Sequence, residues 1–92
     1  MSNDQTDPKE QIILATFWEK AKQAAAQGQH EQARAWIEGI VELDGKNVDA
    51  WLRLAQLVPD ARERMLCYSR VLELAPGNPQ AKAGLRRTRR EM

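Results

Sequence analysis

The sequence contains 92 residues, of which 42% are hydrophobic and 29% are charged, with a formal net charge of +1. This balance predicts one small soluble domain, and no apolar run approaches the roughly 18 residues that a membrane-spanning helix requires. The N-terminal segment lacks the basic and then apolar pattern of a signal peptide, so we expect a cytoplasmic protein. The lone Cys67 excludes an internal disulfide and is expected to be a buried thiol.

The chain begins with a polar segment, and the first helix follows it. Residues 1–7 contain little to bury and are expected to form a disordered tail. Asp7, Pro8 and Glu10 then form a typical helix start, with a carboxylate cap, a proline in the first turn and a capping-box glutamate. A helix is therefore predicted over residues 8–27, ending at Gly28. Its apolar residues recur at helical spacing and are Ile13, Leu14, Phe17, Trp18, Ala21, Ala24 and Ala25.

Three further amphipathic helices are predicted over residues 30–43, 47–57 and 60–75. Asn47 and Asp60 have the short polar side chains that cap the starts of the last two. The apolar positions of each helix recur at three or four residues, which predicts one buried face per helix. They are Ala33, Trp36, Ile37, Ile40 and Val41 in the first, Trp51, Leu54, Ala55 and Val58 in the second, and Tyr68, Val71, Leu72 and Ala75 in the third.

The last predicted helix, over residues 79–90, is strongly basic. Its apolar stripe is thin and consists of Ala81, Leu85 and Thr88, with Met92 as a further candidate. Its basic residues are Lys82, Arg86, Arg87, Arg89 and Arg90, and the only acidic residue of the segment is Glu91. Either this helix is the solvated cap of the fold, or its basic face binds nucleic acid, an acidic partner or an anionic surface.

A recurring spacing links six residues of the third and fourth predicted helices: Trp51, Leu54, Ala55, Val58, Tyr68 and Pro76. This spacing resembles the tetratricopeptide repeat, whose pattern is W-x-x-L-G-x-x-Y, followed by A-x-x-x-F and then P. In this pattern the tryptophan fills the space between two helices, so Trp51→Ala is expected to cost roughly 3–5 kcal/mol of stability. Two features depart from the pattern, because the segment is shorter than the full repeat of about 34 residues and Arg64 stands where a small residue is expected.

The first two predicted helices resemble a degenerate copy of the same repeat. Phe17 takes the place of the tryptophan, Ala21 and Ala33 take the two small places, and Ile37 takes the aromatic place. Lys20 and Gly45 stand where leucine and proline are expected. The resemblance implies a single domain over residues 8–92, divided into repeat one (9–47), repeat two (48–78) and a capping helix (79–92).

The resemblance also implies an all-α fold, in which antiparallel helical hairpins stack as a short right-handed superhelix of five helices. The first helix of each repeat would line a concave groove that binds a peptide or helix of a partner protein. By position, the groove residues would be Trp18, Lys22, Leu52, Arg53, Gln56 and Arg87. The family's carboxylate clamp of Lys, Asn and Arg is not reproduced, because its places are occupied by Trp18, Lys22, Arg53, Gln80 and Gly84.

We therefore expect a small adaptor or accessory subunit, with no catalytic residues, metal site or cofactor. His30 is the only histidine, and no cysteine or carboxylate lies at a metal-ligand spacing from it. The alternative function is binding of nucleic acid or an anionic surface through the basic helix. Two repeats and a thin cap would leave apolar surface uncovered, so the run Ile12, Ile13 and Leu14 is a candidate interface with a larger partner or with a second copy.

Overall fold

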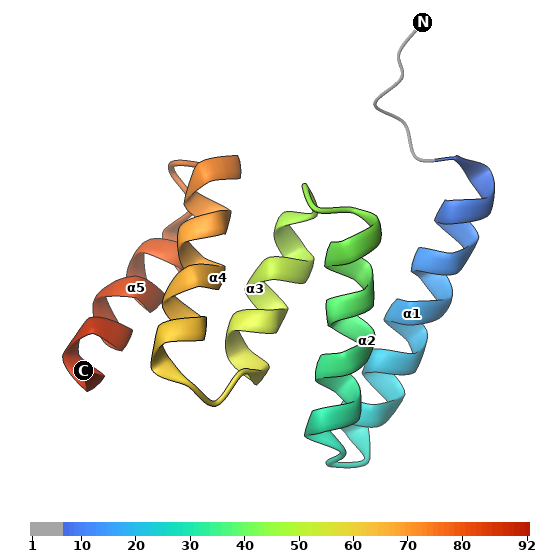
Figure 1. The fold of residues 1–92 in the computed structure, drawn as a ribbon, viewed down its shortest axis with the longest axis horizontal. Coiled ribbons are helices and arrows are strands. Elements are labelled where there is room, and N and C mark those ends of the chain that lie inside the picture. Colours follow the sequence, from blue (N-terminus) through green and yellow to red (C-terminus); the bar gives the residue numbers. More distant parts are fainter. Residues whose placement is uncertain (1–6) are drawn as a thin grey trace, which may run out of the picture. The chain divides into compact units, whose positions relative to one another are not determined.

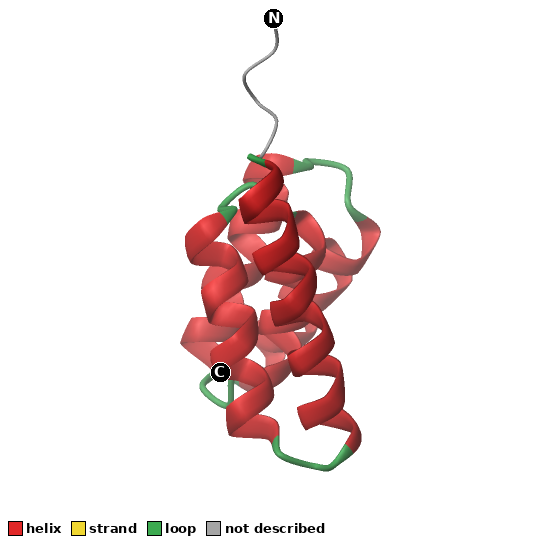
Figure 2. Ribbon diagram, turned by 90° about the vertical axis from the view of Figure 1, so that its right-hand side faces the viewer, coloured by secondary structure: helices red, strands yellow, loops and turns green. Residues whose placement is uncertain are grey.

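The computed structural model describes residues 7–92 and contains five helices joined by short loops (Figure 1). Six of the seven residues of the predicted tail, 1–6, lie outside the described residues. The helices are α1 (Pro8–Ala26), α2 (His30–Leu43), α3 (Val48–Leu57), α4 (Ala61–Leu74) and α5 (Pro79–Glu91). Figure 2 shows helices and loops, and no strand, over this described part of the chain. The predicted all-α fold of five helices is therefore confirmed.

The helices divide into two compact units, with the boundary between Gly45 and Lys46. The first unit contains the antiparallel pair α1 and α2, and the second contains α3, α4 and α5 (Figure 1). In the second unit α4 packs against both α3 and α5. No helix of the described chain is long and apolar enough to cross a membrane.

Short polar side chains define where four of the helices begin. At each start a side-chain oxygen accepts a hydrogen bond from a backbone N–H of the first turn, which would otherwise have no partner within the helix. The pairs are Asp7 Oδ1 with Lys9 at 3.0 Å, Asn47 Oδ1 with Ala50 at 3.0 Å, Asp60 Oδ2 with Glu63 at 3.3 Å, and Asn78 Oδ1 with Ala81 at 2.9 Å. The start of α2 has no such side-chain cap. Between α1 and α2, Gly28 adopts a φ of 76°, a left-handed conformation that glycine accepts without strain.

Six aliphatic side chains form the core of the first unit, and two half-buried aromatic rings pack beside it. The buried side chains are Leu14, Ala21 and Ala24 from α1, and Ala33, Ile37 and Ile40 from α2. The rings of Phe17 and Trp36 lie 5.1 Å apart at an interplanar angle of 59°. The Phe17 ring also lies against Gly39, where a Cβ atom would be only 2.8 Å from Cε2. Glycine at residue 39 therefore leaves the space that the ring of Phe17 occupies.

The second unit has a larger core, built by three helices. Its buried residues are Ala50, Leu52, Leu54, Ala55 and Val58 around α3, Cys67, Tyr68 and Val71 from α4, and Ala81, Gly84 and Thr88 from α5. Cys67 is a buried thiol, as predicted. The buried hydroxyl of Thr88 donates to the carbonyl oxygen of Gly84 at 2.8 Å, so it adds no unsatisfied polar group to the core.

Two expectations about the core need correction. Trp51 faces the same side of α3 as Leu54 and Val58, but it is half-buried and not deeply buried. In α5 the buried stripe includes Gly84, whereas the predicted Leu85 is only half-buried. The physical reason is the ring of Tyr68, which lies against Gly84 and places that side of α5 closest to α4.

Candidate partner-binding surfaces

The first unit contributes two of the residues predicted to line the groove, and both are on α1. Trp18 is half-buried, so its indole retains surface that another molecule can contact. Lys22 lies one helical turn further along α1 and is exposed. Its ammonium group is 3.6 Å from Glu19 Oε1, and both side chains remain largely in solvent. An exposed pair of this kind leaves the lysine available for a new partner at little cost.

The second unit contributes three predicted groove residues from α3, and they differ in accessibility. Leu52 is only 9% exposed, so it belongs to the core and offers little surface. Arg53 and Gln56 are exposed, and Arg53 Nη1 lies 3.5 Å from Gln56 Oε1. The accessible part of this helix therefore presents a cation held beside an amide.

The remaining predicted groove residue, Arg87, belongs to a continuous basic surface on α5. We define the α5 basic face as the side chains of Lys82, Arg86, Arg87, Arg89 and Arg90, all of which are exposed. At about 100° of rotation per residue, these five positions span an arc of about 160°. The arc lies opposite the buried positions of the same helix, Ala81, Gly84 and Thr88. The predicted basic patch is thus a single surface in the structure.

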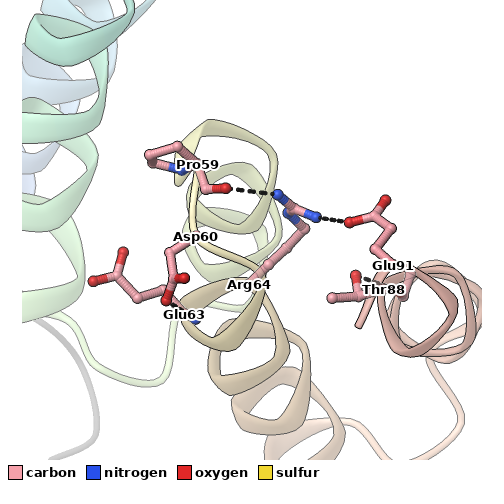
Figure 3. Close-up of polar contacts among 7 residues, drawn as sticks. Pro59, Asp60, Glu63, Arg64, Thr88 and Glu91 are labelled. Atoms are coloured by element: carbon pink, nitrogen blue, oxygen red, sulfur yellow. Dashed lines mark hydrogen bonds and ion pairs between the residues drawn. The ribbon is translucent and has the colours of Figure 1, made fainter.

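Arg64 joins the start of α4, the preceding loop and the last turn of α5 (Figure 3). Its Nη2 donates to the carbonyl oxygen of Pro59 at 3.1 Å, and its Nη1 forms an ion pair with Glu91. The expected small residue at this position is therefore replaced by a cation with two specific partners. Because Glu91 is the only acidic residue of α5, this pairing occupies the carboxylate that could otherwise neutralise the α5 basic face.

Only part of the apolar run at the start of α1 is exposed to solvent. Ile12 and Ile13 are 69% and 41% exposed, but Leu14 is 9% exposed and packs in the core of the first unit. Leu14 is therefore removed from the candidate interface, because consecutive residues of a helix point in different directions and only one side of α1 faces α2. Leu43, which belongs to none of the predicted sites, is 41% exposed and lies at the same end of this antiparallel pair.

The described residues offer no constellation for metal chemistry. His30 is exposed at the start of α2. Among residues 7–92, no group of three or more His, Cys, Asp or Glu side chains is placed to hold a metal ion.

Comparison with known families supports the resemblance that the residue spacing carries. Residues 14–57 match the family model of the tetratricopeptide repeat. The matched segment includes most of α1, all of α2 and all of α3. A search of curated proteins found no match. The resemblance to this repeat family is thus confirmed, and the match covers most of the copy that departs from the motif at Lys20 and Gly45, together with the first helix of the second copy.

Proposed function

We propose that this chain, which belongs to the tetratricopeptide repeat family, is a protein-interaction module that acts as a small adaptor or accessory subunit in the cytoplasm. The observation that carries the proposal is the family match over residues 14–57. Repeats of this family bind a peptide or helix of another protein through the first helix of each repeat. In this chain those helices are α1 and α3, with α5 in the corresponding place after them.

The side chains on these helices specify the chemistry of the partner. Trp18 supplies a half-buried indole, and a tryptophan with a packed base and an accessible edge is a favourable anchor for an apolar side chain. Lys22 and Arg53 supply exposed positive charge, and Arg87 supplies a further one from α5. These features favour a partner segment that combines an apolar anchor with acidic residues. Leu52 is too buried to make a large contact, so we assign it to the support of α3.

The proposal is tested by affinity capture from extract of the native cells, followed by titration with the captured partner. We expect the double variant Trp18→Ala, Arg53→Ala to lose this partner, while the chain remains helical by circular dichroism. A matched control is Lys46→Ala, Arg62→Ala, which removes two exposed cations from outside the groove set. If the captured protein binds the groove variant as tightly as it binds the wild type, the groove assignment is wrong.

A second contact area for the same partner is the exposed pair Ile12 and Ile13, and self-association through this pair is the alternative. Apolar side chains this exposed are favourable sites for association when they are adjacent. We favour the partner, because the sequence shows no self-complementary motif. We expect sedimentation at micromolar concentration to give a monomer, and Ile13→Lys with Trp18→Ala to weaken partner binding. A concentration-dependent dimer that Ile13→Lys dissolves would assign the pair to self-association.

A further inference from the structure

The exposed side chains of the α5 basic face are all of one charge. Between residues 82 and 90, every exposed residue is lysine or arginine. The other four residues of this stretch are buried or half-buried, and they are Ala83, Gly84, Leu85 and Thr88. The exposed surface is therefore cationic, and among residues 82–90 the half-buried Ala83 is the one uncharged residue within its arc.

The surrounding acidic groups leave this charge uncompensated. Glu91, the only carboxylate side chain on α5, forms its ion pair with Arg64 of α4. Within the described chain, none of the five cations lies within ion-pair distance of an acidic side chain. The face thus presents five like charges over about 12 Å of helix, at about 1.5 Å per residue.

The chemistry of the face discriminates among anionic partners. A protein interface has a core depleted of charge and enriched in aromatic residues, and the α5 basic face has no such core. Single-stranded nucleic acid is bound largely by aromatic stacking, and no aromatic residue lies on α5. Insertion into a membrane surface needs an apolar face, but the apolar side of α5 is packed against α4.

Double-stranded nucleic acid satisfies these constraints, because its outer surface is a regular array of phosphates. Duplex DNA carries one phosphate per about 1.7 Å of axis, so about seven phosphates occupy the length of the face. Four of the five cations are arginines, whose planar guanidinium groups bind phosphate oxygens in a bidentate manner. We infer that the α5 basic face binds the phosphate backbone of a nucleic-acid duplex without sequence preference, as a function additional to the proposed binding of a protein partner.

The inference is tested by fluorescence anisotropy of the full chain with a labelled DNA duplex of about 20 base pairs, between about 50 and 200 mM salt. We expect saturable binding, with a slope of log K against log salt between about −3 and −4.5, because each phosphate contact contributes about −0.9. Two duplexes of unrelated sequence should bind within about twofold of each other, because backbone contacts carry no sequence information.

A pair of matched double variants locates the site. Arg86→Gln, Arg89→Gln should weaken binding by more than about tenfold and reduce the slope by about 2, whereas the helical spectrum is unchanged. Lys46→Gln, Arg62→Gln removes the same charge from exposed positions outside α5, and it should change the affinity by less than about threefold.

Several results would overturn the inference. They are absence of duplex binding at about 50 mM salt, an equal loss in the two double variants, tighter binding of a single strand than of the duplex, and displacement of the duplex by an equimolar poly-glutamate peptide. Tighter binding of anionic vesicles than of the duplex would assign the face to a lipid surface and would also contradict it.

Discussion

The ring of Tyr68 on α4 lies so close to Gly84 on α5 that a Cβ atom at residue 84 would be 2.3 Å from Cζ of the ring. Tyr68 is only 4% exposed, so the ring is enclosed on its other sides. Glycine therefore allows α5 to approach the aromatic ring directly, which no larger residue permits at this distance. The contact between these two residues sets how closely the basic helix α5 packs on α4.

We expect Gly84→Ala to destabilise the protein by about 1–2 kcal/mol. The added methyl group displaces a buried ring, which typically costs about 1–3 kcal/mol, and the better helix propensity of alanine offsets up to about 1 kcal/mol. Urea unfolding followed by circular dichroism measures the change. Gly77→Ala is the control, because a Cβ atom there meets nothing within 4 Å, and its effect should stay within about 0.5 kcal/mol.

The same substitution in the first unit, Gly39→Ala, should be milder. A Cβ atom at residue 39 would be 2.8 Å from Cε2 of Phe17, but that ring is half-buried and can rotate toward solvent. The propensity gain of about 1 kcal/mol then offsets most of the cost, so we expect a net change within about 1 kcal/mol. A loss larger than that of Gly84→Ala, in the same unfolding experiment, would contradict the difference in ring freedom.

Arg64 and Glu91 should show a measurable coupling free energy. A double-mutant cycle with Arg64→Ala and Glu91→Ala is expected to give about 0.5–1 kcal/mol, because the arginine is partly buried and also donates to Pro59. The coupling should fall in about 1 M salt. Arg70 and Glu73, an exposed pair at 2.8 Å within α4, form the control cycle and should give about 0.3 kcal/mol. Equal coupling free energies in the two cycles would mean that the ion pair of Arg64 with Glu91 is no stronger than an ordinary exposed pair.

The cap at the start of α5 should contribute to stability, because its side chain satisfies a backbone N–H. Asn78→Ala removes the 2.9 Å hydrogen bond from the Ala81 N–H and should cost about 1 kcal/mol. Gln29→Ala is the comparison, because Gln29 occupies the cap position of α2 without a side-chain cap bond. Its effect on the midpoint of thermal unfolding should be within error of wild type, and a comparable drop for both variants would exclude capping as the cause.

Trp51→Ala should cost about 2 kcal/mol, which is less than the sequence pattern indicates. A half-buried indole loses part of the transfer free energy that full burial would contribute. Leu54→Ala, at a buried position of the same helix, is expected to cost at least as much, about 2–4 kcal/mol. Chemical denaturation of the two variants side by side decides the order, and complete unfolding of the Trp51 variant alone would restore the original expectation.

The helices could be predicted from the sequence because their ends depend on local chemistry. The predicted bounds lie within one residue of the observed ones, since Asp7, Asn47, Asp60 and Asn78 each cap a helix through a residue two or three positions away. Gly28 ends α1 through its own backbone conformation. Interactions between residues two or three positions apart can be recognised from a short stretch of sequence.

The contacts between helices could not be predicted in the same way. Arg64 and Glu91 are separated by 27 positions, and their pairing depends on how α4 and α5 pack. Leu14 and Leu52 illustrate the same limit, because both were predicted as surface residues and both are 9% exposed. A repeat register gives the direction of a side chain on its own helix, but the neighbouring elements determine whether solvent reaches it.

The glycine of α5 and the tyrosine of α4 restrict how this protein can be recombined with other repeat proteins. A capping helix taken from another array will dock on α4 without strain only if it carries a glycine opposite Tyr68, and α5 transplanted elsewhere will leave a void unless an aromatic ring fills the space above residue 84. Tyr68 and Gly84 should therefore be transferred together. Any chimera that separates them needs a compensating change in side-chain volume at the helix contact.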